Sequence, residues 1–270
     1  MTGNPASHAV RQAENSPVFR VLARLGYAVN GLLHVLIGII ALTVALGSGG
    51  GESADQTGAL GQLAANPAGR ALLWVIVVGL VALGLWQVVA GFQVRNSDPK
   101  KAWGKRASEF GKAVAYLAVG ATALTFALGG SKSSSDSSQS ASATALAAPG
   151  GVFAIVVVGL VVAGIGVFFV FRGVTRRFTK DLSLPSGPVG TAVVVVGAAG
   201  YIAKGIALAV VGVLFIVAAV TFDPAKATGM DGALKALAAL PFGTVILIAV
   251  GVGLIAYGAY LGARARWGRL

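Results

Sequence analysis

Six long apolar runs, separated by short polar stretches, dominate the pattern of this chain. The runs do not alternate apolar with polar positions, so they favour helices over the strands of a membrane barrel. Each run reaches the roughly 20 residues that a helix needs to cross about 30 Å of hydrocarbon. The sequence therefore predicts an all-α membrane protein with six spans. These spans lie at about 25–46, 71–92, 108–129, 152–171, 193–220 and 242–263.

The apolar runs contain an internal repeat. The pattern Gly-Leu-[Val/Ile]-[Ala/Val]-x-Gly occurs at 79–84, 159–164 and 253–258. The first and third copies align without a gap at a shift of 174 residues, which matches Tyr27 with Tyr201. The middle copy follows at a shift of 82 residues and then of 80 residues. Self-similarity over such a length predicts three copies of one structural unit.

Each repeat contains two spans, so all three repeats enter and leave the membrane on the same side. Parallel repeats of this kind predict pseudo-threefold symmetry about an axis along the membrane normal, with three helical hairpins in a ring. The predicted organisation is a flexible cytoplasmic tail at 1–16, a first repeat at 17–95, a second at 96–178 and a third at 179–267.

Polar residues at matched places predict where helices begin. Ser16 and Asp98 each precede a proline, which is typical of an N-cap followed by the first helical residue. Thr57 and Asp231 occupy equivalent positions and predict N-caps of two short amphipathic helices on the outer side. The middle repeat has the serine-rich stretch 131–142 instead, which predicts a flexible solvated loop and one missing outer cap.

Composition and charge agree with a membrane protein. The chain is 56% hydrophobic and 11% charged, with a mean hydropathy of +0.82 and a net charge of +12. Of its 21 Lys and Arg residues, fifteen lie in the tails and the even-numbered loops and four in the other loops. This asymmetry predicts that both termini are cytoplasmic. The basic loops then face anionic headgroups of the bilayer, and no recognition helix or aromatic platform indicates nucleic-acid binding.

Recurring motifs resemble a known family. They are the Gly-Tyr-x-x-[Asn/Lys]-Gly openings at 26–31 and 200–205, and the Gly-Ala-Leu-x-x-Leu-Ala-Ala-x-Pro-x-Gly elements at 58–69 and 232–243. With the second-span motif, they resemble domain-of-unknown-function family 1206, bacterial membrane proteins with three tandem two-span repeats. The resemblance covers nearly all of 17–267 and implies the bacterial plasma membrane. It implies no activity, substrate or catalytic residue.

One polar position recurs in all three repeats, just inside the predicted cytoplasmic edge. It is occupied by Asn30, Lys112 and Lys204, with His34, Tyr116 and Leu208 one turn deeper. If this face points inward, Asn30, His34, Lys112, Tyr116 and Lys204 would form a basic ring that binds an anion or a lipid headgroup. Alternatively, both lysines extend to nearby headgroups, and Asn30 and His34 bond helix backbones. Glu109, three residues before Lys112, predicts an ordinary ion pair.

Little other chemistry is visible in the sequence. Recurrent glycines predict close helix packing or, alternatively, hinges for alternating access. There is no cysteine, and the two histidines, His8 and His34, make a poor metal site, so we expect neither metal nor cofactor. No nucleophile or nucleotide motif is present, which predicts a protein that is not an enzyme.

Two functions remain open from the sequence. The first is a non-enzymatic accessory, scaffold or lipid-associated membrane protein, with room for a membrane-protein partner. The alternative is a small-molecule or lipid transporter with a basic polar site in the cytoplasmic half of the bundle. A scaffold predicts a centre filled by small apolar residues, whereas a transporter predicts a polar-lined cavity.

Overall fold

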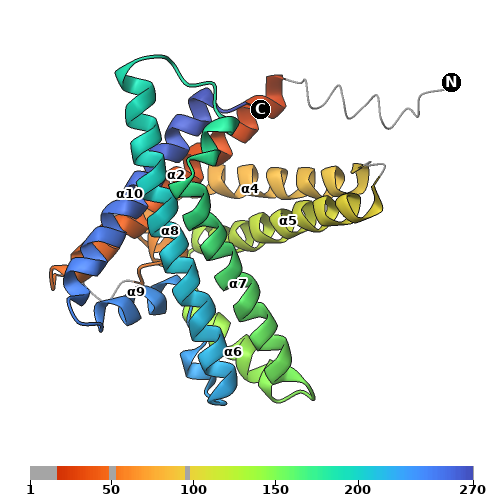
Figure 1. Ribbon diagram of the computed structural model, residues 1–270, viewed down its shortest axis with the longest axis vertical. Coiled ribbons are helices and arrows are strands. Elements are labelled where there is room, and N and C mark those ends of the chain that lie inside the picture. The colour runs from red at the N-terminus through yellow and green to blue at the C-terminus, as the bar shows by residue number, and fades with distance from the viewer. Residues whose placement is uncertain (1–16, 49–52, 95–97, 270) are drawn as a thin grey trace. The chain divides into compact units, whose positions relative to one another are not determined.

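The computed structural model describes residues 17–48, 53–94 and 98–269, and these residues form mainly helices (Figure 1). Six of its helices are long and apolar enough to cross a membrane, as predicted. They are α2 (Pro17–Ala45), α4 (Pro67–Gln93), α5 (Pro99–Ala127), α7 (Gly151–Val174), α8 (Pro188–Val220) and α10 (Gly243–Trp267). Shorter elements connect them: α3 (Gln56–Ala64), α6 (Ser134–Leu146), η1 (Arg177–Asp181), η2 (Pro224–Lys226) and α9 (Met230–Ala238).

Capping side chains set where several spans begin. The predicted cap Asp98 accepts a hydrogen bond from the Lys100 N–H at 3.0 Å, directly before Pro99 opens α5. Asn66 does the same for α4 through the Gly69 N–H at 2.7 Å. Both caps satisfy a donor that the first helical turn would otherwise leave unpaired. The other predicted cap, Ser16, lies outside the described residues.

The described residues form two compact units. Unit 1 comprises residues 17–29, 62–94 and 98–131, and unit 2 comprises 30–48, 53–61 and 132–269. In unit 1, α4 packs along α5 (Figure 1). In unit 2, α8 packs against both α7 and α10, and the part of α2 from Asn30 onward packs against α10.

Each first span packs against the second span of another repeat. Helix α5 of repeat 2 contacts α4 of repeat 1, and α8 of repeat 3 contacts α7 of repeat 2. Helix α2 of repeat 1 contacts α10 of repeat 3 through its glycines. The same kind of helix pair therefore occurs three times along the chain. Threefold symmetry relating the repeats stays a prediction.

Paired glycines bring the backbones of unit 2 together. Gly31 lies opposite Gly258 and Gly38 opposite Gly251, so α2 and α10 run antiparallel. Helices α8 and α7 repeat this register with two further pairs, Gly205 with Gly166 and Gly212 with Gly159. A Cβ atom on any of these eight glycines would lie 2.5 to 3.1 Å from the carbonyl oxygen of its partner. The spans can approach this closely only because these side chains are absent.

We expect the Gly205→Leu substitution to separate α8 from α7. Its Cβ would lie 2.6 Å from the Gly166 carbonyl oxygen, and backbone cannot move aside as a flexible side chain can. Overpacking of this kind costs about 1–3 kcal/mol, and we expect the upper end. Thermal unfolding in detergent measures the loss. The matched control is Gly164→Leu on α7, whose Cβ meets nothing within 4 Å. Equal melting temperatures for the two variants would contradict close backbone packing.

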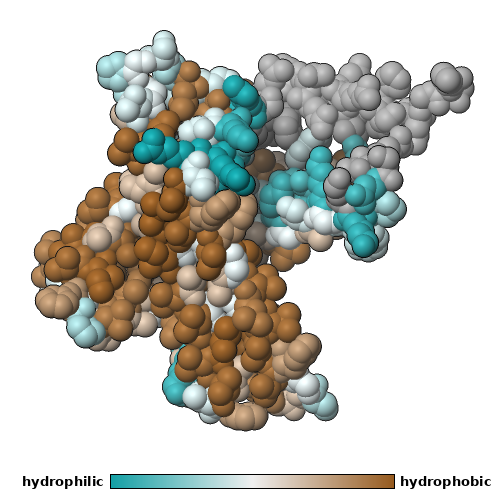
Figure 2. All heavy atoms as spheres, viewed as in Figure 1, coloured by the Kyte–Doolittle hydropathy of each residue, from teal (hydrophilic) through white to brown (hydrophobic). Residues whose placement is uncertain are grey.

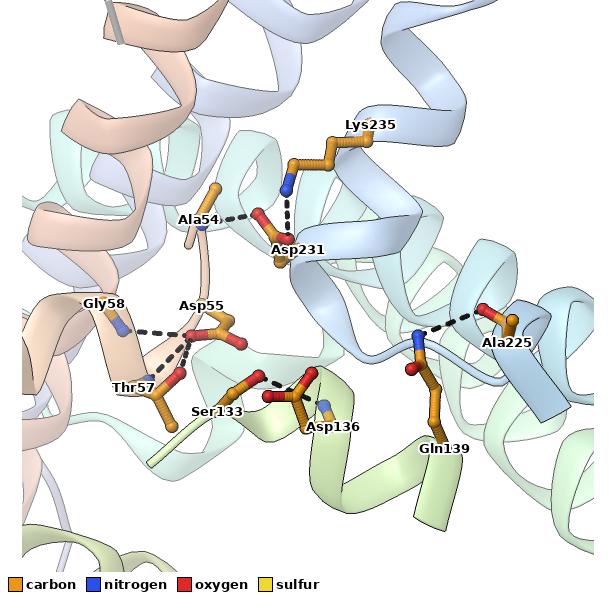
Figure 3. Close-up of polar contacts among 10 residues, drawn as sticks. All are labelled: Ala54, Asp55, Thr57, Gly58, Ser133, Asp136, Gln139, Ala225, Asp231 and Lys235. Carbon is orange, nitrogen blue, oxygen red and sulfur yellow. Dashed lines mark hydrogen bonds and ion pairs between the residues drawn. The ribbon is translucent and has the colours of Figure 1, made fainter. Parts of the chain in front are cut away.

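Each of the short helices α3, α6 and α9 lies between the two spans of one repeat. We call the end of the spans where these three helices lie the cap end. The serine-rich stretch that predicted a flexible loop is mostly helical here, so that prediction is wrong. Ser133 caps α6 by accepting from the Asp136 N–H at 3.1 Å, and the Gln139 side chain donates to the Ala225 carbonyl at 3.1 Å (Figure 3). Ser142 is buried. The middle repeat therefore has a cap of its own, fixed by contacts that its composition does not reveal.

The predicted N-caps Thr57 and Asp231 also act differently. Helix α3 is capped by Asp55, whose Oδ1 accepts from the Thr57 N–H at 2.8 Å and the Gly58 N–H at 3.1 Å (Figure 3). Helix α9 begins at Met230 after Gly229. Asp231 instead accepts from the Ala54 N–H at 2.8 Å and pairs with the Lys235 ammonium at 2.7 Å (Figure 3). Its carboxylate thus joins repeat 3 to repeat 1.

Replacing Asp231 by Ala should destabilise the cap end. The change leaves the Ala54 N–H without its acceptor, and an unsatisfied buried donor costs about 1–3 kcal/mol. Asp231→Asn keeps an acceptor oxygen and should recover most of the loss. Lys235→Ala removes an ammonium whose side chain is 61% exposed, so we expect less than about 1 kcal/mol. Chemical unfolding curves of the three variants test this order, and a Lys235→Ala loss equal to that of Asp231→Ala would contradict it.

Candidate functional site

Five aromatic rings pack together at the opposite end of unit 2, which we call the basic end. This aromatic cluster consists of Phe169 of α7, Phe178 of η1, Tyr201 of α8, and Tyr257 and Tyr260 of α10. Tyr201 stacks on Phe178 with ring centroids 5.0 Å apart and meets Tyr257 and Tyr260 edge-on, each at 5.3 Å. Offset and edge-to-face pairs add stability beyond the area that they bury. Three chain segments are therefore joined by one set of ring contacts.

Glycines of α8 make room for these rings. A Cβ on Gly197 would lie 2.6 Å from the Phe178 ring and 2.8 Å from the Tyr260 ring. A Cβ on Gly200 would lie 2.5 Å from the Tyr257 backbone. Phe178 comes from the 3₁₀ turn after α7 and is fully buried. The local chain therefore turns back so that the Phe178 ring enters the space that Gly197 leaves open, and Gly200 lets the α10 backbone approach α8.

Two of the predicted polar residues lie against this cluster. The Lys204 ammonium lies 4.4 Å from the centroid of the Tyr257 ring and 5.3 Å from that of Phe169, within cation–π range of both. His34 packs edge-on against the same Tyr257 ring at 4.9 Å. His34 is buried, and its Nδ1 donates to the Asn30 carbonyl at 2.8 Å. The structure thus brings His34 and Lys204 together on one ring.

An arginine pair holds a single carboxylate at the rim of the cluster. Asp181 forms an ion pair with Arg172 and lies 3.6 Å from the Arg264 guanidinium. The Arg172 guanidinium also lies over the Tyr201 ring at 5.5 Å. A backbone hydrogen bond joins the same two segments, because the Ser183 N–H donates to the Trp267 carbonyl at 2.8 Å. The end of α10 is thereby tied to the segment that follows α7.

Of the other three predicted site residues, Asn30 lies in unit 2, and Lys112 and Tyr116 lie in unit 1. Lys112 pairs with Glu109 at 2.6 Å, so the predicted ion pair three residues apart is confirmed. The Lys112 side chain is 44% exposed, and Tyr116 is half-buried on the same helix. Convergence of all five predicted residues on one axis stays a prediction.

Sequence reasoning missed the aromatic cluster and the Asp181 pairs. A signal was present: Tyr257 replaces the leucine found at the equivalent position of repeat 1, Leu83, and Tyr260 follows three residues later on the same helix face. The match of Tyr201 with Tyr27 indicates the repeat but not the ring contacts of Tyr201. Phe178 gave no signal, because its role depends on a turn between two spans.

The charged groups gathered at this end are mainly cations. Within the described ranges, no three His, Asp or Glu side chains gather as a metal site would require, and the sequence has no cysteine. The rim combines guanidinium groups with ring faces at the end of apolar spans. Cations at the end of apolar spans are typical of residues that meet phospholipid headgroups, whereas four of the five rings, all but Phe169, are buried.

The fold and the repeats define a multi-pass membrane protein built from three tandem two-span units. A family model described as "Domain of Unknown Function (DUF1206)" matches residues 25–93, 108–176 and 199–268. The chain belongs to this family. The first and third matches begin at residues 25 and 199, the same offset that aligns the two repeats in the sequence.

One curated relative is similar over part of the chain. It is "Uncharacterized protein YxxB" of Bacillus subtilis (strain 168), 33% identical over 173 residues, which are 62% of this chain and 61% of the relative. The chain therefore spans less than two thirds of the length of that relative. No solved structure matches.

Replacing Asp181 by Asn tests the rim. The change keeps the size of the side chain but removes the carboxylate charge that Arg172 and Arg264 share. Because the Asp181 side chain is 36% exposed, we expect a loss of only about 1 kcal/mol. Hydrogen exchange should accelerate at 181–183 and 267–269. Glu109→Gln removes an ion pair in unit 1 and should leave these two segments unchanged; equal effects of both variants there would contradict the assignment.

Proposed function

We propose that this protein is a non-enzymatic, lipid-associated membrane scaffold that binds anionic phospholipid headgroups at its basic end. The proposal places it in the bacterial plasma membrane with both termini in the cytoplasm. The observation that carries it is the surplus of cations beside the aromatic cluster. The cations of this end are Arg172, Arg176, Arg177, Lys180, Arg264, Arg266 and Arg269, and Asp181 is the carboxylate among them in the two segments 172–181 and 264–269.

The position of these cations supports a headgroup partner. Figure 2 shows hydrophilic side chains gathered where α7 ends, and a broad hydrophobic surface over the spans of unit 2. Exposed apolar residues such as Phe168 and Phe171 lie on α7 directly before the basic segment. Each Lys or Arg near an anionic leaflet contributes about 1 kcal/mol of attraction. Cations at the boundary of an apolar surface therefore favour phospholipid over a soluble anion.

The packing of unit 2 supports a scaffold. Glycine pairs close the α2–α10 and α8–α7 interfaces to backbone contact, and ring faces lie beside the Lys204 ammonium. A transporter would need a polar path past Lys204, and the aromatic cluster occupies that region instead. Rigid helix pairs with a charged end suit a protein that fixes the position of lipids or of a neighbouring membrane protein.

Neutralising three exposed cations tests the proposal. Arg176, Arg177 and Lys180 are all exposed, and replacing them together by Gln removes about 3 kcal/mol of attraction, which is on the order of a hundredfold in affinity. Native mass spectrometry of purified protein titrated with phosphatidylglycerol measures the change. Phosphatidylcholine binding should stay the same.

The chain offers a matched control at the cap end. Lys132, Lys226 and Lys235 are also exposed, and their triple Gln variant carries the same change in net charge. We expect it to bind phosphatidylglycerol like the unchanged protein. Equal losses in both triple variants would mean that total charge, not the basic end, attracts the lipid, and unchanged binding in both would refute the proposal outright.

A further inference from the structure

Unit 1 contains an apolar pocket of about 320 Å³ between α4 and the first part of α2, up to Val29. Its walls include Leu25 and Val29 of α2, and Trp74, Val75 and Gly79 of α4. Every residue around it is apolar. The volume lies within the range of ordinary ligand pockets, about 300–1,000 Å³.

The third repeat shows what this pocket replaces. Helices α2 and α4 meet where Gly26 contacts Leu83, and helices α8 and α10 meet at the equivalent residues, Gly200 and Tyr257. One turn further the two repeats differ. In repeat 3, a Cβ on Gly253 would collide with the Ala203 side chain. In repeat 1, the equivalent Gly79 meets nothing within 4 Å.

A difference in side-chain size accompanies this opening. Val29 stands where repeat 3 has Ala203, and Val29 lines the pocket. The α2 and α4 spans of repeat 1 therefore lack the contact that Ala203 and Gly253 make in repeat 3. The interface between α8 and α10 is closed at this position in repeat 3, whereas α2 and α4 of repeat 1 leave the pocket open; we call this pocket the wedge.

We propose that this wedge holds an acyl chain of a membrane phospholipid. Both walls are membrane spans, so the medium that reaches the opening is hydrocarbon, and apart from the Trp74 indole the walls carry no polar side chain for a polar ligand. A helix is about 10 Å across and is too wide for this volume, whereas a single chain is not. The exposed cation Arg24 precedes Leu25 at the end of the span and fits the phosphate of the same lipid. The proposal deepens the lipid association proposed above and places it at a second site.

Filling the wedge from Gly79 tests this inference. Gly79→Leu sends a side chain into the empty space, and leucine favours a helix more than glycine does, so the variant should fold as well as the unchanged protein. Val75→Trp narrows the wedge from an exposed position if the first variant is unstable. Gly164→Leu is the matched control, because its Cβ also meets no other atom and it lies on α7 of unit 2.

Native mass spectrometry in detergent counts the phospholipids retained by each variant. We expect Gly79→Leu to lose one tightly held phosphatidylglycerol, and Gly164→Leu to retain as many as the unchanged protein. The headgroup fragment glycerophosphoglycerol should not compete for this lipid. Equal retention in all three proteins, or full competition by the headgroup fragment, would overturn the inference. A change in the dimer fraction with Gly79→Leu would identify the wedge as a protein interface and would overturn it too.

The two lipid proposals fail separately. The Gln variant of Arg176, Arg177 and Lys180 should keep the wedge lipid while losing its preference for anionic headgroups. If Gly79→Leu has no effect but this triple variant does, only the wedge is refuted. The reverse result would leave the wedge lipid in place and refute the basic end.

Discussion

Backbone contact between antiparallel spans is the constraint on which unit 2 depends. Lipid chains are as apolar as leucine, so burying apolar side chains gives membrane helices little reason to associate. Association comes from close packing, and the paired glycines provide it by removing every atom between two backbones at Gly31, Gly38, Gly205 and Gly212. Two further glycines of α8 act in the same way: Gly197 leaves room for the Phe178 and Tyr260 rings, and Gly200 for the backbone of Tyr257. The packed interfaces and the aromatic cluster thus have one physical origin.

The sequence predicted the features that local patterns determine. Six spans follow from the length of apolar runs, three repeats from matched motifs, and the glycine packing from the recurrence of small residues. It failed at the cap end, where the decisive contacts join distant segments. Gln139 reaches Ala225 and Asp231 reaches Ala54, and no local pattern marks either pair. A serine-rich stretch therefore suggested a loop although Ser133 and Gln139 hold it as a helix.

The site was predictable only in part, for a related reason. Comparison of the repeats identified Lys204 and His34, because a polar residue inside an apolar span stands out in any sequence. Their surroundings did not stand out, since tyrosine and phenylalanine are ordinary in membrane helices. Whether such rings face lipid or one another depends on which helices meet. Phe178 shows this most clearly, because it enters the cluster from a turn outside both spans that it contacts.

Divergence between the repeats explains how one duplicated unit supplies several kinds of surface. The closed pair at Ala203 and Gly253 of repeat 3 corresponds to the open wedge at Val29 and Gly79 of repeat 1. At the cap end, Asp55 caps its own helix, whereas Asp231 binds the backbone of another repeat. Repeat 1 can lose the contact between α2 and α4, because α2 packs on α10 and α4 packs on α5. Positions that the repeats share therefore determine the fold, and candidate sites lie at positions where the repeats differ.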